Sequence, residues 1–314
     1  MEFLDVTLRD GGHQVGFNWP TEFMVPYLNA ISRVEEIAFV EVGYWGQEGK
    51  FLGPYYSLGK QDLESRFAIS EKTKLAVMID YHYCNKDLDS YPKASDENSV
   101  GLIRVTARQD QVDDAFSFMS DLADATGIMV SCNIFNVSNY VSSDLDRVVD
   151  KALDLSVSVV AFADTHGAMD MRIEKAVWKR RIQRIHEAGK KSGIHLHDHL
   201  GLAHVNKDVS EELDLDFCDV SLKGIGKGLG NLRLEHCVDI TDNDEILRLW
   251  SIYDSFMQMP AGPWGYLTAC YSATDHYAEQ AQHLGLNPAQ LRVALESMSQ
   301  SERDNYEPRL LMMQ

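Results

Sequence analysis

Two histidines separated by one residue are the clearest indication of metal chemistry in this sequence. The segment "HLHDH" spans 195–199. Alternate side chains of a β-strand point to the same face, so His195 and His197 can direct both imidazoles toward one ion. Two imidazoles and a carboxylate suit Mn²⁺, Fe²⁺ or Zn²⁺, and Asp10 is a candidate for the carboxylate. Imidazoles that only fill space at a rim explain an isolated pair equally well, and His197 with His199 is an alternative pair.

The elements that must position these side chains alternate between strand and helix, as in repeated βα units. Short apolar segments alternate with longer helical patterns through the first 240 residues, which indicates a parallel sheet. The predicted strands are Phe3–Leu8, Ala38–Val42, Leu75–Asp80, Gly101–Thr106, Ile128–Ile134, Val157–Ala163, Gly193–His197 and Asp219–Leu222. Helical spacing of apolar residues is found in Val112–Ala123, from about Ser143, and through Ile173, Val177 and Ile185. Eight strands fit a closed (β/α)8 TIM barrel, although a doubly wound open sheet gives much the same alternation.

In a parallel barrel, catalytic groups collect where the strands end, because the loops there converge on one mouth. Every candidate falls at that end of the predicted sheet. The candidates outside the histidine segment are Arg9 and Asp10 after the first strand, Glu41 in the second, Asp164 after the sixth, and Lys227 and Asn231 after the eighth. The last two lie in "GIGKGLGN", 224–231, whose glycines allow either close approach to a bound group or simply a tight turn. This segment is not the dinucleotide-binding pattern GxGxxG.

Proline and glycine in "MPAGPWGY", 259–266, interrupt the alternation, and the remaining sequence is helical without another clear strand. We therefore predict a barrel domain at 1–258 and a C-terminal helical extension at 259–314. The polar segment "NKDLDSYPKASDEN", 85–98, is predicted to be a surface loop.

Composition excludes several classes of protein. The formal net charge is −19 over 314 residues, without a Lys/Arg-rich run, so a nucleic-acid partner is not expected. The five cysteines show no CxxC spacing, which favours reduced thiols in an intracellular protein. No apolar run reaches the ~18 residues of a membrane span. We expect a cytoplasmic protein without a membrane partner.

Four ordered motifs together resemble the DRE-TIM metallolyase superfamily, also called the HMGL-like or pyruvate carboxyltransferase-type barrels. They are "TLRDG" after the first strand, "ADTHG" after the sixth, "HLHDHLGLAHVN" at the seventh and "GIGKGLGN" after the eighth. The resemblance covers most of residues 1–240 and implies a closed barrel, with Asp10, His195 and His197 as metal ligands and Arg9 as the group that holds an enolate. We expect Mn²⁺ first, with Mg²⁺, Co²⁺ or Zn²⁺ as alternatives.

Position 13 separates the branches of this superfamily. Isopropylmalate synthases and HMG-CoA lyases carry glutamine there, whereas 4-hydroxy-2-oxovalerate aldolases carry histidine, as this chain does. His13 could accept the proton of a 4-hydroxyl group, because its reference pKa is near neutral. The segment "GYLTACYSATDHYAEQA", 265–281, is similar to the tyrosine-containing helix of those aldolases, so Tyr266 or Tyr271 is a candidate catalytic tyrosine. The alternative for each tyrosine is an aromatic side chain that only packs a helix on the barrel.

The remaining candidates have supporting roles. Glu41 and Asp164 could orient the metal ligands or Arg9, or could simply be paired with neighbours. Lys227 replaces a small residue of the aldolase loop and could bind a distal anionic group of the substrate, or be solvated. Asn231 closes the glycine motif and is assigned to substrate binding or to support of the ligands.

The resulting expectation is a divalent-metal-dependent aldolase that cleaves or forms a 4-hydroxy-2-oxo acid through a pyruvate-type enolate. Its expected partners are a 2-oxo acid, an aldehyde and a second copy of the chain in a dimer. An aldehyde dehydrogenase partner is not carried over, since the chain lacks much of the segment through which those aldolases dock one. The alternative is a Claisen-type synthase that condenses an acyl-CoA with a 2-oxo acid, and a non-enzymatic metal-binding barrel is a third possibility.

Overall fold

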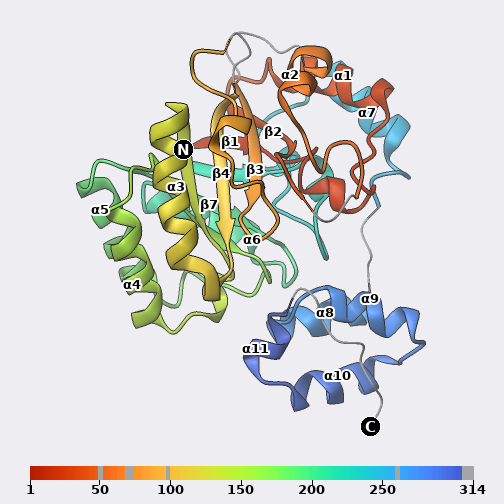
Figure 1. The fold of residues 1–314 in the computed structure, drawn as a ribbon. Coiled ribbons are helices and arrows are strands. Elements are labelled where there is room, and N and C mark those ends of the chain that lie inside the picture. The colour runs from red at the N-terminus through yellow and green to blue at the C-terminus, as the bar shows by residue number, and fades with distance from the viewer. Residues whose placement is uncertain (49–51, 68–73, 97–99, 259–261, 306–314) are drawn as a thin grey trace.

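The strands form one closed parallel barrel. The computed structural model describes residues 1–48, 52–67, 74–96, 100–258 and 262–305, and within them eight strands pair in the order β1 to β8, with β1 closing on β8 (Figure 1). The strands are β1 Glu2–Asp5, β2 Ile37–Tyr44, β3 Lys74–Asp80, β4 Val100–Ala107, β5 Met129–Ile134, β6 Val159–Asp164, β7 Lys191–Leu196 and β8 Phe217–Val220. The predicted TIM barrel is confirmed, and closure excludes the open sheet.

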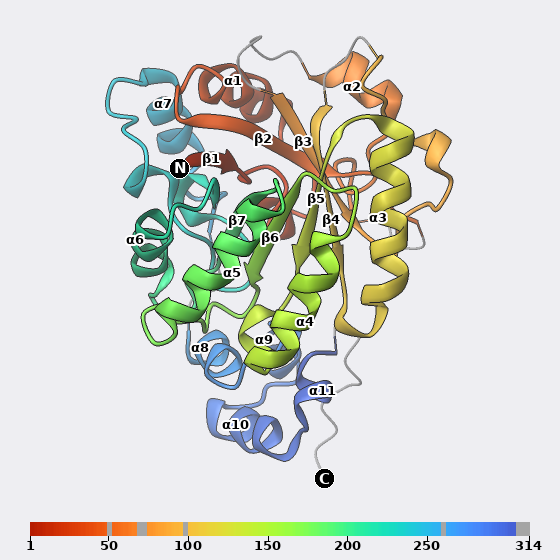
Figure 2. The ribbon, with the colours of Figure 1, turned by 90° about the vertical axis from the view of Figure 1, so that its left-hand side faces the viewer.

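Helices cover the outside of the barrel and one of its ends. Those around the barrel are α1 Thr21–Ile31, α2 Lys60–Arg66, α3 Val112–Thr126, α4 Ser142–Leu153, α5 Lys175–Glu187, α6 Ala203–Glu212 and α7 Asp244–Tyr253. The later helices are α8 Pro263–Cys270, α9 His276–His283, α10 Pro288–Ser297 and α11 Gln300–Arg303. Figures 1 and 2 show these last four at the end toward which the strands run. None of the helices described has the length and apolarity needed to cross a bilayer.

Alternation along β4 shows how the barrel interior is layered. Leu102 belongs to an apolar cluster at the start of the strands. Two residues later, the buried Arg104 bonds to Glu41 of β2 and to Asp219 of β8, the strand across the barrel from β4. Another two residues on, Thr106 lines a cavity at the mouth. The two-residue period of strands thus stacks an apolar layer, a charged layer and the open end of the barrel.

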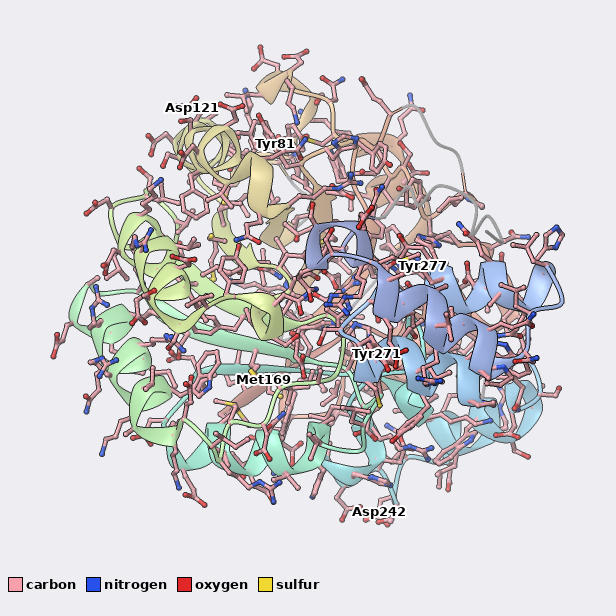
Figure 3. The ribbon with its side chains drawn as sticks, turned by 90° about the horizontal axis from the view of Figure 1, so that it is seen from below. Tyr81, Asp121, Met169, Asp242, Tyr271 and Tyr277 are labelled. Atoms are coloured by element: carbon pink, nitrogen blue, oxygen red, sulfur yellow. The ribbon has the colours of Figure 1, made fainter. Side chains whose placement is uncertain are left out.

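The C-terminal helices have a small apolar core of their own. It contains Ala273, Tyr277, Ala281, Leu286, Leu291 and Leu295. Polar contacts join these helices to the barrel: His166 Nε2 lies 3.1 Å from Asp304 Oδ1, and Lys227 Nζ lies 3.1 Å from Asp275 Oδ1. Figure 3, a view from this end, shows them lying across part of the barrel mouth. The predicted division at 258/259 adjoins residues 259–261, outside those described, and remains a proposal.

Several predicted boundaries differ from the structure. The first strand ends at Asp5 rather than Leu8, because Asp10 N bonds to Val6 O (2.8 Å) and the chain begins to turn. The eighth strand spans Phe217–Val220 rather than Asp219–Leu222, and a 3-10 turn begins at Leu222. Apolar residues continue into these turns because the turns are buried, so hydrophobicity alone extends the strands too far.

Two further expectations require correction. Ile173 does not belong to the buried face of a helix: α5 begins at Lys175, and the Ile173 side chain is 80% exposed. The predicted surface loop 85–98, of which 97 and 98 lie outside the described residues, contains a 3-10 turn and the fully buried Tyr91, whose hydroxyl donates to Asn85 O (2.6 Å). One aromatic side chain therefore anchors a segment whose composition is mostly polar.

Candidate active site

Three side chains at the barrel mouth can converge on one metal ion. Asp10, His195 and His197 are buried, and one ligand atom from each lies within 4.8 Å of the others. The two Nε2 atoms are 3.2 Å apart. Two nitrogens about 2.1 Å from one ion, at roughly a right angle, would be separated by about 3 Å. The described residues contain no other such group of three, and we call this one the His–Asp cluster.

The neighbours of the two imidazoles also fit a metal site. His195 Nδ1 lies 2.8 Å from Asp219 Oδ2, so its Nε2 is left to face His197. A carboxylate on the far nitrogen fixes the tautomer and orientation of a ligating histidine. His197 Nδ1 is buried without a hydrogen-bond partner among the described residues. The rings of His197 and His199 also lie close, but His199 Nε2 is 3.2 Å from Lys227 O, which favours the pair with His195.

The loop after β8 holds Asp10 in place. Asn231 Nδ2 donates to Asp10 Oδ2 (2.7 Å), and the Lys227 backbone N donates to the same oxygen (3.2 Å). A Cβ on Gly226 would lie 2.6 Å from that oxygen and 2.3 Å from Asn231 Nδ2. Only glycine allows this approach. Asn231, predicted to bind substrate or to support the ligands, therefore orients the candidate ligand Asp10.

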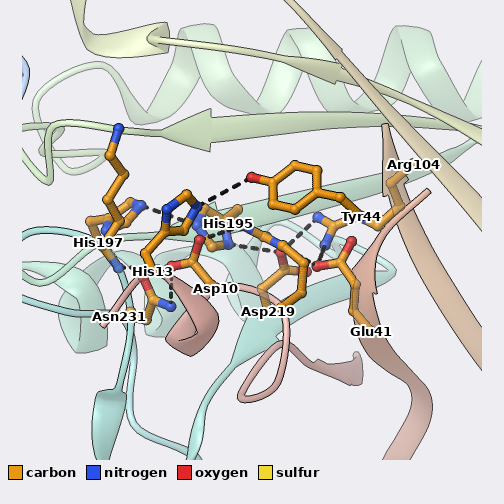
Figure 4. A network of polar contacts seen from close by, with 12 residues as sticks. Asp10, His13, Glu41, Tyr44, Arg104, His195, His197, Asp219 and Asn231 are labelled. Carbon is orange, nitrogen blue, oxygen red and sulfur yellow. Dashed lines mark hydrogen bonds and ion pairs between the residues drawn. The ribbon is translucent and has the colours of Figure 1, made fainter. Parts of the chain in front are cut away.

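A chain of alternating charges lies beneath the His–Asp cluster (Figure 4). Arg9 Nε donates to Glu41 Oε2 (2.7 Å), and the Arg9 Nη1 pairs with Asp10. Arg104 bonds to the same Glu41 oxygen (3.2 Å) and to Asp219 Oδ2 (2.6 Å). Glu41 thus contacts Arg9, one of the two possibilities that the sequence raised. Arg104 and Asp219 were not anticipated as site residues, although a charge inside an apolar strand was a signal that could have identified them.

Burial and these charges set the protonation states. Burial opposes ionisation of Asp10, but Arg9 and the nearby imidazoles hold its pKa well below the usual value. Burial lowers the pKa of His197 far below its usual value. Burial also lowers the pKa of His13 to about 3, with Lys227 and Arg9 acting in the same direction against Asp10. Near neutral pH the cluster therefore presents an anionic carboxylate and a neutral His197 imidazole, as metal binding requires.

A cavity of about 180 Å³ opens beside the cluster. Its lining includes the His–Asp cluster together with Arg9, His13 and Tyr44. Tyr56, Asp80, Tyr83 and Arg108 also line it, as does His276 from the C-terminal helices. Pockets for drug-sized ligands measure about 300–1,000 Å³, so this smaller cavity suits a small metabolite.

Comparison with known proteins identifies the family of this chain and several distant relatives. The sequence profile described as HMGL-like matches residues 1–245. The chain belongs to the HMGL-like family. It is 23% identical over 235 residues to an oxaloacetate decarboxylase of Mycobacterium tuberculosis, which covers 74% of this chain and 67% of that protein. It is also 23% identical over 247 residues to a 4-hydroxy-2-oxovalerate aldolase of Geobacillus thermodenitrificans, covering 76% and 68%.

Solved structures agree on the fold of this HMGL-like chain. The N-terminal domain of a protein from Bacteroides vulgatus, described as a candidate aldolase, matches with a TM-score of 0.69 at 20% identity, covering 89% of this chain and 95% of that one. The carboxyl transferase domain of Rhizobium etli pyruvate carboxylase, with pyruvate, matches with a TM-score of 0.63 at 17% identity, covering 94% and 55%. At these identities the likeness concerns the fold.

The tyrosine beside His13 in this HMGL-like site comes from β2. Tyr44 OH lies 3.3 Å from His13 Nε2 and faces the same cavity. The predicted candidates lie elsewhere, which corrects that expectation. Tyr266 is 55% exposed on α8, a helix whose buried residues are Thr268 and Ala269. The hydroxyl of Tyr271 donates to Glu296 Oε1 (2.7 Å), and neither tyrosine lines the cavity.

Asp164 and Lys227 also differ from their predicted surroundings. Asp164 is fully buried and accepts hydrogen bonds from the backbone N of Ala168 and of Met169 (both 3.1 Å), so it shapes the loop after β6. Burial raises its pKa to about 6. Lys227 lines the cavity, pairs with Asp275 and keeps about a fifth of its side chain exposed. Its contact with an anionic group of the substrate stays a prediction.

Proposed function

We propose that this chain is a divalent-metal-dependent aldolase that cleaves or forms 4-hydroxy-2-oxo acids through a pyruvate-type enolate. The observation that carries the proposal is the convergence of the His–Asp cluster, Arg9 and His13 on one small cavity. The family, with lyases among the relatives at 23% identity, supports the general class of activity. Mn²⁺ is the metal we expect first.

The proposed residues supply separate parts of the chemistry. A divalent ion held by Asp10, His195 and His197 would polarise the keto and carboxylate oxygens of a 2-oxo acid. Arg9 is buried, and Glu41 and Asp10 raise its pKa although burial acts against them, so it is a fixed cation. Its Nε bonds to Glu41 and its Nη1 to Asp10. The other N–H groups of the guanidinium remain to stabilise negative charge on the enolate oxygen.

His13 is the proposed base. Its lowered pKa keeps the imidazole neutral near pH 7, and Tyr44 OH contacts its Nε2. In cleavage, the imidazole accepts the proton of the 4-hydroxyl group, the electrons of the O–H bond form the aldehyde carbonyl, and the C3–C4 electron pair moves into the enolate. The aldehyde leaves, and protonation of the enolate at C3 gives pyruvate. Condensation follows these steps in reverse.

A second candidate activity is decarboxylation of oxaloacetate, favoured by the Mycobacterium relative of that name. Breaking the C3–C4 bond with CO₂ as the leaving group produces the same pyruvate enolate, but no hydroxyl proton has to be removed. His13 should therefore matter much less for this reaction. The Claisen-type alternative is less well supported, because the relatives at 23% identity are a decarboxylase and an aldolase.

A metal-supplemented substrate screen tests the proposal. Purified protein with Mn²⁺, Mg²⁺, Co²⁺ or Zn²⁺ is incubated with 4-hydroxy-2-oxo acids, and pyruvate release is followed with lactate dehydrogenase. A parallel assay combines acyl-CoA with 2-oxo acids and measures free CoA. We expect pyruvate release that His195→Ala abolishes. Release of CoA alone would establish the synthase instead.

A further inference from the structure

The side of the cavity opposite the His–Asp cluster is lined by polar groups from several loops. Tyr56 follows β2, Asp80 ends β3, Tyr83 follows it and Arg108 follows β4. We call these four residues the polar wall. In the closed strand order, β3 and β4 stand across the barrel from β7 and β8. A 2-oxo acid held at the cluster would therefore extend its remaining atoms toward the polar wall.

Two members of the polar wall have unused hydrogen-bonding capacity. Asp80 Oδ1 accepts from the backbone N of His82 (3.0 Å), while its second oxygen has no hydrogen-bond partner among the described residues. The Tyr56 hydroxyl also has no hydrogen-bond partner among the described residues, although Tyr56 is 95% buried and packs against Tyr44. Burial raises the pKa of both groups. Both side chains line the cavity, so a ligand there could take the place of water as their hydrogen-bond partner.

The other two members supply a donor and an aromatic surface. Arg108 Nη2 donates to Tyr83 OH (3.5 Å), and the guanidinium carbon lies 5.6 Å from the centre of the Tyr83 ring. The polar wall therefore presents a carboxylate acceptor, a guanidinium donor and phenols that can do both. This mixture matches hydroxyl groups, each of which donates and accepts.

We propose that the aldehyde partner carries hydroxyl groups beyond its carbonyl carbon, so that condensation with pyruvate yields a 3-deoxy-2-oxo sugar acid. This inference rests on the proposed aldolase function and specifies its substrate class. The new bond joins pyruvate C3 to the aldehyde carbon, C3 loses one proton, and the carbonyl oxygen gains one as the 4-hydroxyl. An alkyl aldehyde would cover Asp80 and Tyr56 without replacing their bonds to water, which is costly.

Charge separates this substrate class from an aldehyde with a second carboxylate. Asp80 would repel such a group, because two close carboxylates disfavour each other's ionised form. The positive charge of Arg108 is balanced by Asp80, which has a Coulombic interaction with it, and Lys227 is paired with Asp275. Neutral hydroxyl groups suit this balance better than an added anion does.

Aldehydes matched in length test the inference. With pyruvate, we compare glyceraldehyde and propanal, which share a three-carbon skeleton, and include succinic semialdehyde as the anionic probe. The kcat/KM for glyceraldehyde should exceed that for propanal by at least about 100-fold, since a site built to bind hydroxyl groups rejects the analogue without them. Equal values, or a preference for succinic semialdehyde, would overturn the inference.

Variants locate the preference on the polar wall. Asp80→Ala should reduce the ratio of kcat/KM for glyceraldehyde to that for propanal by roughly tenfold or more. Tyr56→Phe, which keeps the ring, should reduce it less but in the same direction. Asp89→Ala is the matched control, because the Asp89 side chain is 87% exposed and pairs with Lys93. A ratio left intact by Asp80→Ala would contradict the assignment of the polar wall.

A separate readout distinguishes this inference from the proposed function. The wild-type protein with Mn²⁺ is incubated with pyruvate in D₂O, and exchange of the C3 protons is followed by NMR. Exchange without a preference for glyceraldehyde leaves the enolate chemistry standing and rejects the hydroxylated substrate. The exchange is repeated with Mg²⁺, Co²⁺ and Zn²⁺, and its absence with all four metals, together with absence of cleavage, contradicts the aldolase function and this inference with it.

Discussion

The two sides of the cavity can be compared by how their polar groups are paired. Beneath the His–Asp cluster, Arg9, Glu41, Arg104, Asp219 and His195 form a continuous series of contacts between 2.6 and 3.2 Å. On the polar wall, the second Asp80 oxygen and the Tyr56 hydroxyl have no hydrogen-bond partner among the described residues and belong to side chains that line the cavity. The unpartnered atoms of the first side, such as Glu41 Oε1 and His197 Nδ1, are instead enclosed by protein. Paired groups hold a fixed geometry, whereas groups at the cavity surface without a hydrogen-bond partner can bind a substrate. The first side is therefore suited to the reaction, and the second to recognition.

The largest effect should follow from removing a candidate ligand. His195→Ala takes one imidazole from the cluster and should lower kcat for pyruvate release by about a thousandfold or more, because metal-ion catalysis contributes several kcal/mol. Bound Mn²⁺, measured by elemental analysis after dialysis, should fall in parallel while the circular dichroism spectrum is retained. A folded variant with its full metal content would contradict the cluster as a metal site.

His13 should divide the two candidate reactions. His13→Ala should lower aldol cleavage by about 10²–10⁴-fold, the usual contribution of a general base. Oxaloacetate decarboxylation needs no hydroxyl deprotonation and should change by less than about tenfold. Both rates are measured by pyruvate release under identical metal supplementation. A similar loss in the two reactions would show that His13 acts in some other way, for example on enolate formation itself.

Stability measurements sharpen the comparison between paired and unpaired groups. Asp219→Asn removes a charge that Arg104 and His195 share in the barrel interior, and should lower the free energy of unfolding by about 3 kcal/mol. Metal affinity should also fall about 10–100-fold, because Asp219 orients His195.

Thr106→Val removes a buried hydroxyl oxygen that has no partner among the described residues, and should change stability by less than about 1 kcal/mol. Chemical denaturation compares the two, and equal losses would refute the contrast.

The smallest effect is a pH dependence at Asp80. Burial raises the pKa of Asp80, so the Asp80 carboxyl group binds its proton more tightly in the folded state than in the unfolded state. Its stabilising contribution is present below the unfolded-state pKa of about 4 and is lost as the pH rises through the raised folded value. Asp80→Asn cannot ionise, so its Tm relative to wild type should improve between pH 4 and pH 8. Parallel Tm curves across that range would argue against a shifted pKa.

Asp219 provides the opposite sign for the same experiment. Arg104 and His195 lower its pKa against the effect of burial, so its contribution is present above the unfolded-state value and is lost on acidification. The Tm deficit of Asp219→Asn should therefore shrink as the pH falls. Two carboxylates of one barrel should thus respond to pH in opposite directions, in line with their pairing.

Much of the architecture could be predicted because it depends on local periodicity. The alternation of strands and helices indicated eight βα units, and the two-residue spacing of His195 and His197 placed both imidazoles on one face. Motif order then placed Asp10 and Arg9 at the same mouth, where the structure has them. These predictions need only the geometry of a strand and the rule that loops converge at one end of a parallel barrel.

Other features could not be read from local patterns. Tyr44, and not the predicted Tyr266 or Tyr271, is the tyrosine at the cavity, where it contacts His13. Arg104 joins Glu41 to Asp219, and Asp275 of the C-terminal helices pairs with Lys227. Each of these pairs joins residues from separate elements. Which pairs meet depends on how the barrel closes and on how the C-terminal helices lie across its mouth.

The sequence by itself therefore determined the alternation of strands and helices and the residue types that can hold a metal and an enolate, and the resemblance of its motifs indicated the closed barrel and the family. Tertiary structure alone decided which charges are paired across the barrel and which polar groups face the cavity without a partner. The physical reason is that the direction of a side chain along a strand is set by the backbone of that strand. A hydrogen bond between β4 and β8, or the polar wall with residues from three loops, instead depends on the register of the whole closed sheet.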